Sequence, residues 1–292
     1  MYICIIFCVL IIYSAGYFIG TIKELIMRRL ENDEIHACLL DILKAVDRFC
    51  TESGLRYSMA YGTLLGAVRH KGFIPWDDDI DILMPRPDFD RFVATFGKEP
   101  GSRYRCLYNT DNEEGCFIHF FAKVQDTHTV SHQGKFVRYR FGLNIDVFPV
   151  DGKPDDVHVQ QKMERKLSSW SHRLNICGTK FDILDFHQPL FSKLEAHLLG
   201  PEHWAQKCNE LMRSYDFGKC RMAGSVSVTY NGLREIFERS MFENYTELEF
   251  EGCRFKAFAD WEKFLVQQYD DYMQLPPMNK RKHHHIISYM KD

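Results

Sequence analysis

Apolar side chains recur every three or four positions over residues 35–49, near the start of the chain. This spacing predicts an amphipathic helix whose apolar face covers part of a hydrophobic core. Asn32 or Asp33 is the expected cap at its start, and Gly54 is the expected stop.

A short apolar run at residues 55–60 predicts a strand, and residues 64–69 predict a helical turn. Gly62 and Thr63 lie between the two segments. A strand, a glycine turn and a helix are together typical of a phosphate-binding site, because the amides at the start of the helix point at whatever lies over the turn.

Carboxylates alternate with apolar residues from Asp79 onward. If residues 79–83 form a strand, Asp79 and Asp81 share one face while the isoleucines between and after them enter the core. Two carboxylates one strand step apart suit a hard divalent ion, which binds carboxylates, waters and substrate phosphates. The prolines that follow end the strand, and a helix is expected over residues 88–96.

Two further apolar runs, at residues 116–124 and 143–147, predict strands. The second places Asp146 between two core residues. A buried charge needs a partner, so Asp146 is either salt-bridged or a metal ligand.

The second half of the chain is mostly helical in its pattern, and no Gly/Ser-rich linker divides it. We therefore expect one continuous domain or two tightly packed lobes. A hairpin is expected around Glu251 and Gly252. The expected helices and hairpin strands cover residues 155–176, 186–199, 202–215, 246–250, 253–257 and 261–269.

The first 22 residues carry no charged side chain. As a helix they would measure roughly 33 Å, against about 30 Å for the hydrocarbon core of a bilayer, so a single membrane anchor is expected. A signal peptide would have a basic region before the apolar run, which is missing here, and a buried N-terminal helix is the third alternative. Lys23, Arg28 and Arg29 follow the span and place the rest of the chain on the cytoplasmic side.

Composition narrows the class of protein. The 292 residues are 45% hydrophobic and 14% aromatic, which indicates a globular chain. A net charge of −3 gives no basic field for nucleic acid, so DNA and RNA are not expected partners. The ten cysteines are scattered without a zinc-ligand spacing, so most are expected to be reduced and buried.

Five segments of the chain are distinctive: YGTLLGAVRH (residues 61–70), GFIPWDDDID (72–81), FAK (121–123), NIDVFPVDG (144–152) and FEG (250–252). Together they resemble the LicD family, which includes phosphocholine transferases and is related to fukutin and fukutin-related protein. The resemblance covers most of residues 35–282, and its long first motif is highly specific.

The resemblance implies an α/β (α+β) nucleotidyltransferase-like fold, a mixed sheet with flanking helices, over residues 31–282. An N-terminal transmembrane helix (1–22) would precede it and a polar tail (283–292) would follow. This chain lacks the clustered-cysteine zinc insertion of the fukutin-related branch, which favours the shorter microbial type.

The resemblance also assigns the site. Asp79 and Asp81 are expected to hold Mg²⁺ or Mn²⁺, and Asp146 is expected to be a third ligand or the general base. The alternatives are an acidic surface turn for the pair and a buried ion pair for Asp146. Asp77 and Asp78 are expected to lie behind the ligands or in solvent.

Four other residues are expected to contact the substrate. Gly62 would allow close approach of a phosphate and Thr63 would donate its hydroxyl, unless the two form an ordinary helix cap. Arg69 and Lys123 are candidate phosphate clamps, with surface salt bridges as the alternative. His70 and the triplet at 283–285 are weaker candidates, and a solvated tail is favoured for the triplet.

The expected reaction transfers a substituted phosphate, such as phosphocholine or a polyol phosphate, from a CDP-linked donor to a hydroxyl of a cell-surface glycan or glycolipid at the membrane. A second hypothesis interprets Asp79-Ile80-Asp81 as the DxD motif of a sugar-nucleotide glycosyltransferase. A third is a membrane-tethered glycan-binding relic without activity, which intact carboxylates disfavour.

Overall fold

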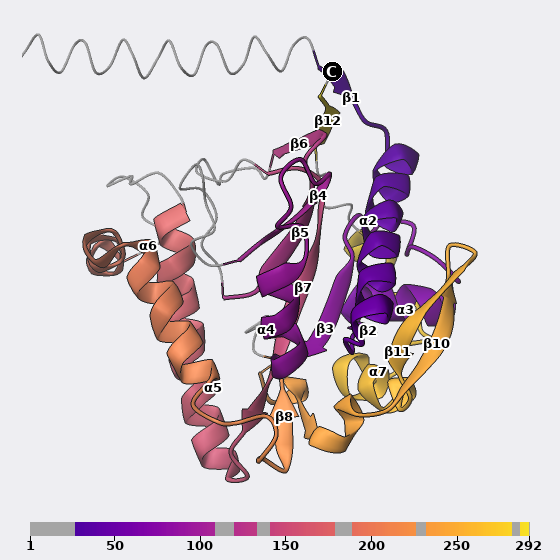
Figure 1. Cartoon of the computed structure of the whole chain (residues 1–292). Coiled ribbons are helices and arrows are strands. Elements are labelled where there is room, and N and C mark those ends of the chain that lie inside the picture. The colour runs from indigo at the N-terminus through magenta and orange to yellow at the C-terminus, as the bar shows by residue number, and fades with distance from the viewer. Residues whose placement is uncertain are drawn as a thin grey trace, which may run out of the picture.

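The computed structural model describes residues 27–108, 120–132, 141–178, 189–225, 232–281 and 287–291. Its helices flank a central sheet on both sides (Figure 1). The α-helices are α2 (Asn32–Ser53), α3 (Tyr61–Arg69), α4 (Arg86–Thr95), α5 (Val157–Gly178), α6 (Leu190–Met212) and α7 (Trp261–Tyr269). Short 3₁₀ helices are η1 (Gly232–Glu235), η2 (Arg239–Phe242) and η3 (Met278–Lys280).

The central sheet is mixed and has the order β2-β3-β7-β5-β4, with β8 and β9 added on β7. Among the described strands of this sheet, only β3 and β7 run parallel, and the other pairs are antiparallel. Its strands are β2 (Ser58–Met59), β3 (Asp81–Pro85), β4 (Tyr104–Leu107), β5 (Ala122–Asp126), β7 (Asn144–Lys153), β8 (Met222–Gly224) and β9 (Ile236–Glu238). The expected mixed sheet with flanking helices is therefore confirmed.

Two smaller sheets complete the fold. The expected hairpin is confirmed as β10 (Tyr245–Phe250) and β11 (Cys253–Phe258). The third sheet joins distant parts of the chain in the order β1-β12-β6, from β1 (Arg28–Arg29), β12 (Ile287–Met290) and β6 (Thr129–His132). Residues 287–290 belong to the stretch expected as a polar tail. In the structure they pair with β1 and β6, and the Ser288 hydroxyl is buried 2.7 Å from that of Ser131.

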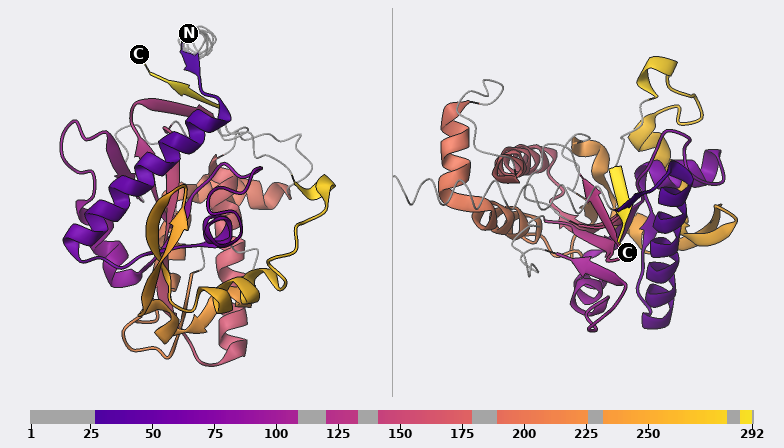
Figure 2. Two further views of the ribbon diagram at one scale, coloured as in Figure 1. Left: turned by 90° about the vertical axis from the view of Figure 1, so that its right-hand side faces the viewer. Right: turned by 90° about the horizontal axis from the view of Figure 1, so that it is seen from above.

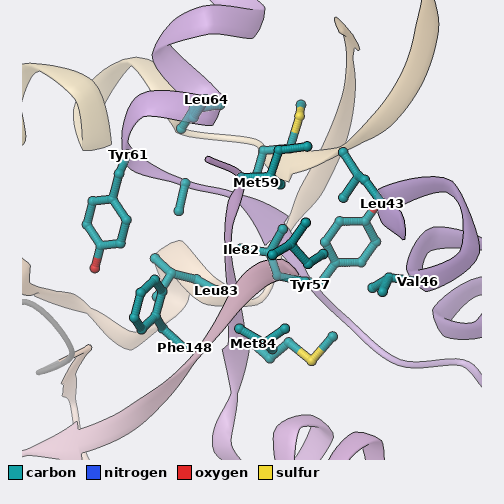
Figure 3. Close-up of a cluster of buried hydrophobic side chains, with 14 of the residues drawn as sticks. Leu43, Val46, Tyr57, Met59, Tyr61, Leu64, Ile82, Leu83, Met84 and Phe148 are labelled. Atoms are coloured by element: carbon teal, nitrogen blue, oxygen red, sulfur yellow. The ribbon is translucent and has the colours of Figure 1, made fainter. Parts of the chain in front are cut away.

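The main core lies between the sheet and α2, as the periodicity of the first helix predicts. Leu43 and Val46 of α2 pack toward Tyr57, Met59 and the apolar side chains of β3 (Figure 3). Burial of one such side chain contributes about 1.5–3 kcal/mol. The helix begins with a capping box between Glu31 and Glu34 rather than at the asparagine or aspartate expected from the sequence.

The segment expected as a strand and a glycine turn is arranged differently. Strand β2 has two residues, and α3 begins already at Tyr61, whose φ of 45° is unusual for a side chain other than glycine. Gly62 and Thr63 therefore lie in the first turn of the helix, not before it. Likewise β3 begins at Asp81, so the expectation that Asp79 shares this strand is wrong. The alternation of apolar and polar residues in these short segments does not determine the residue at which strand pairing begins.

A second, smaller core joins α5 and α6 on the opposite side of the sheet from α2 (Figure 1). The sequence predicts two helices where α6 lies, and the structure has a break at Gly200, with φ 78° and ψ 165°, followed by Pro201. Across the described ranges, no helix is long and apolar enough to cross a membrane. The expected span at residues 1–22 and the histidines at 283–285 lie outside these ranges.

The seven cysteines that the structure describes are free thiols, as expected from their spacing. Burial raises the pKa of Cys50 to about 12. This thiol therefore acts as a small hydrophobic group rather than as a nucleophile.

The tip of the β10-β11 hairpin holds the loop that precedes the aspartates. The Glu251 carboxylate accepts a hydrogen bond from the Phe73 amide at 3.0 Å, and the Glu251 amide donates to the Lys71 carbonyl at 2.8 Å. A Cβ on Gly72 would lie 2.0 Å from the Glu251 carboxylate, so a side chain there would displace this carboxylate from its hydrogen bond with the Phe73 amide. This contact explains why the FEG segment accompanies the GFIPW segment.

We expect Glu251→Ala to lower the free energy of unfolding by about 1 kcal/mol, because the Phe73 amide loses its acceptor. Chemical denaturation measures the change. Glu249→Ala removes a neighbouring exposed carboxylate from the same hairpin and should have little effect. Equal losses in the two variants would contradict the role assigned to Glu251.

Candidate active site

Three charged side chains lie in register across three neighbouring strands of the central sheet. Asp81, the first residue of β3, is opposite Asp146 of β7, and Asp146 is opposite Lys123 of β5. Opposed residues of adjacent strands present their side chains on the same face of a sheet. The row thus brings together residues that are far apart in the sequence.

Lys123 is tied into this row. Its ammonium forms an ion pair with the Asp146 carboxylate and donates to the Asn144 side-chain oxygen at 3.0 Å. The rings of Phe121 and Phe141 lie 5.4 and 5.5 Å from the Lys123 nitrogen. Only 8% of the Lys123 side chain is exposed, so the surface salt bridge considered as an alternative is wrong. Such a lysine can hold Asp146 in place and meet an anion from the same position.

The carboxylates around the row carry more negative charge than Lys123 can offset. Burial raises the pKa of Asp81 well above its usual range, and Asp79, Asp146 and Asp77 raise it further, whereas Lys123 lowers it. Burial also raises the pKa of Asp146, against the opposite effect of Lys123. The pKa of Asp77 is raised by burial, while a hydrogen bond with Asp79 lowers it. These shifts place four aspartates within one electrostatic neighbourhood.

The chemistry of this donor set fits a hard divalent cation. All the candidate ligands offer carboxylate oxygens, and a cation would offset the repulsion that disfavours their charged forms. Within the described parts of the chain, however, no three or more His, Cys, Asp and Glu side chains are grouped closely enough to hold a metal ion as they stand. Binding of one ion by all three of Asp79, Asp81 and Asp146 would therefore require these side chains to draw together.

The first turn of α3 packs directly against the acidic segment. A Cβ on Gly62 would lie 2.5 Å from a carboxylate oxygen of Asp77, so glycine lets this aspartate lie against the start of the helix. The Thr63 hydroxyl accepts a hydrogen bond from the Asp81 amide at 2.8 Å and is 3% exposed. Thr63 is thus a positioning residue for Asp81 in this structure, and donation of its hydroxyl to a phosphate stays a prediction.

We expect Thr63→Val to lower the free energy of unfolding by about 1–3 kcal/mol, because the Asp81 amide loses its acceptor. Thr63→Ser keeps the hydroxyl and should retain most of the stability. Urea denaturation of the two variants gives the comparison. If Thr63→Ser were as unstable as Thr63→Val, the hydrogen bond would not be the cause.

The structure does not place Arg69 in the row of charges. Its guanidinium donates to the Tyr272 carbonyl at 2.8 Å and to His70 at 3.4 Å. The His70 ring meets Trp76 edge to face at 6.4 Å, and the Arg281 guanidinium lies 5.2 Å from the centre of the Trp76 ring. Arg69 therefore links α3 to the segment after α7, and the phosphate-clamp role has no direct geometric support.

Two residues near the carboxylates have no signal in the local sequence pattern. Tyr269 ends α7, and besides burial the negative charges of Asp81 and Asp77 raise its pKa, which places its hydroxyl near the acidic cluster. Glu235 is buried and accepts a hydrogen bond from the Tyr61 hydroxyl at 2.7 Å. A tyrosine and a glutamate are unremarkable along the chain, so only the tertiary structure brings them to the site.

Comparisons with known proteins agree with the segments quoted above. Residues 54–177 match a family model described as "LicD/FKTN/FKRP, nucleotidyltransferase domain". Over 275 residues, the chain is 30% identical to the lipopolysaccharide cholinephosphotransferase LicD of Haemophilus influenzae, which covers 89% of this chain and 98% of that protein. It is 36% identical to the ribitol 5-phosphate transferase FKRP of Homo sapiens over 69 residues, 22% of this chain and 14% of that protein.

Proposed function

Because this chain belongs to the LicD family, we propose that it moves a substituted phosphate, such as phosphocholine, from a CDP-linked donor to a hydroxyl of a glycan or glycolipid. The chain is a transferase of phosphate-containing groups. The observation that carries the finer proposal is the row of Asp81, Asp146 and Lys123 across three strands, with Asp79 and Asp77 beside it. Buried carboxylates in excess over one lysine suit a bound cation, and such a cation would in turn bind the anionic diphosphate of the donor.

In this reaction the acceptor oxygen forms a bond to the distal phosphorus of the donor, and the bond from that phosphorus to the oxygen of CMP breaks. The hydroxyl proton leaves to a base. Asp79, Asp81 and Asp146 would hold Mg²⁺ or Mn²⁺, which when bound neutralises the diphosphate and stabilises the charge on the leaving CMP.

The protein's own residues prepare this site. Thr63 fixes the backbone of Asp81, and Gly62 leaves room for Asp77. Lys123 orients Asp146 and partly offsets the effect of burial on its charge, and the charged form is the one that a metal ligand or a general base requires. Lys123 would also meet an incoming phosphate oxygen.

The test is release of CMP by the full chain from a panel of CDP-linked donors, with Mg²⁺ or Mn²⁺ and a mixture of glycan acceptors. CMP from one donor, dependent on acceptor and metal, supports the proposal and identifies the donor. Release of UDP or GDP from nucleotide sugars would instead support the DxD glycosyltransferase hypothesis. No turnover, together with no metal-dependent shift in thermal unfolding, would support the non-catalytic relic.

We also propose that residues 1–22 anchor the protein and that the catalytic domain faces the cytoplasm, because Lys23, Arg28 and Arg29 follow the apolar segment. Protease treatment of intact cells tests this orientation. Cleavage of the catalytic domain from outside would overturn it.

A further inference from the structure

The first half of α6 exposes an unusual amount of apolar surface. Five large apolar side chains on it have between 44% and 85% of their surface exposed. We call them the α6 apolar face, and they are Leu190, Phe191, Leu194, Leu198 and Leu199.

This face is not the side on which the helix packs. At about 100° per residue the five side chains fall within one half of the helix, while the buried Lys193 and Ala196 lie on the other half. The break at Gly200 separates this half of α6 from the part that supplies Trp204, Cys208 and other residues of the second core. A contiguous patch of solvent-exposed apolar side chains is typical of an interaction site.

A second apolar element follows α7. In the segment 270–281, which we call the C-terminal loop, Met273, Leu275 and Met278 are between 45% and 76% exposed. In both views of Figure 2, this loop (gold to yellow) and the first half of α6 (salmon) project from the same side of the molecule. The loop is also tied to α3, the helix that carries Thr63, since its Tyr272 carbonyl accepts a hydrogen bond from Arg69.

The second core, between α5 and α6, borders the site as well. Phe121 packs against both cores, and its ring lies 5.4 Å from the Lys123 ammonium. The α6 apolar face and the C-terminal loop are therefore each connected to the row of charges, the first through Phe121 and the second through α3.

We propose that the α6 apolar face and the C-terminal loop rest in the interfacial layer of a lipid bilayer, and so present the active site to the headgroups of glycolipid acceptors. Three observations favour a bilayer. The two elements are separate and project to the same side, so one flat apolar surface can contact both. The first 22 residues of the chain are uncharged, and one relative is named for lipopolysaccharide. The identity of the acceptor rests on the proposed function, whereas the membrane contact does not.

The closing experiment adds a tryptophan as a depth probe to the full chain in vesicles. Leu198→Trp and Met273→Trp report on the two elements. Val159→Trp is the matched control, because Val159 is 40% exposed near the start of α5 and belongs to neither element. Side chains of an interfacial helix lie roughly 5–10 Å deep, so brominated lipids should quench the added emission of the first two variants about twofold or more and leave the control unchanged.

Quenching no greater than in the control would overturn the proposal. Concentration-dependent association of the full chain that is lost in Leu194→Glu/Leu198→Glu, without quenching, would assign the face to a second copy instead. Neither readout needs a donor, an acceptor or turnover, so failure of the membrane contact is distinguishable from failure of the proposed reaction.

The membrane contact also has a consequence for activity, which distinguishes it further from the proposed reaction. Leu194→Glu/Leu198→Glu should lose turnover of a glycolipid embedded in vesicles and keep turnover of the same glycan without its lipid. Equal activity of this variant and the native chain on both acceptors would count against the membrane contact.

Discussion

Asp81→Asn is expected to reduce acceptor-dependent CMP release by about a thousandfold or more, since loss of several kcal/mol of charge stabilisation at the transition state has this effect. The substitution keeps the size of the side chain and removes its charge. Because burial and three neighbouring carboxylates already disfavour that charge, the metal-free variant should unfold at the same or a higher denaturant concentration than the native chain. The substitution should therefore lower catalytic activity without lowering the stability of the metal-free protein.

The matched control is Asp90→Asn, which removes a carboxylate that is 39% exposed and paired with Arg213 on the surface. This variant should keep its activity. We would measure CMP release and thermal unfolding of both variants with and without Mg²⁺. An active Asp81→Asn enzyme, or one that keeps the full thermal shift with Mg²⁺, would remove Asp81 from the metal site.

Arg86→Met is expected to lower the free energy of unfolding by about 3–5 kcal/mol, because it leaves Asp151 buried without its counter-charge. The Arg86 guanidinium donates twice to the Asp151 carboxylate, at 2.6 Å each, and the two side chains are 8% and 1% exposed. Urea denaturation gives the change.

Arg213→Met is the matched control for this pair. It breaks an ion pair with Asp90 that is about 40% exposed on both sides, and such pairs contribute about 0–1 kcal/mol. If the two arginine variants were equally stable, the buried pair would not hold α4 against β7 as inferred.

The two substituted residues have their partners on one strand, β7: Asp81 is opposite Asp146, and Arg86 pairs with Asp151. Asp146 and Asp151 belong to the same quoted segment, but they are five positions apart on β7 and so point to opposite faces of the sheet. Asp146 meets Lys123 on the face of the candidate site, whereas Asp151 meets Arg86 on the other. A family segment therefore contains both a candidate catalytic residue and a structural one.

Local sequence determined the elements whose signals are short in range. Periodicity alone located α2 and α7, the tight turn located the β10-β11 hairpin, and the two helices expected at 186–199 and 202–215 correspond to the two parts of α6. The long motifs identified the family, and alternation drew attention to Asp81 and Asp146. Each of these inferences depends on residues within one or two turns of one another.

The tertiary structure decided the strand register and the side-chain contacts that join residues far apart in the sequence. The register of β3, β7 and β5 joined Asp81, Asp146 and Lys123, and strand pairing began too late to include Asp79. Thr63 became a support for Asp81 because the packing of α3 on β3 brings its hydroxyl to that amide. Strand register and buried ion pairs are set by long-range contacts and by the loss of water around them, and neither leaves a periodic signal in the sequence.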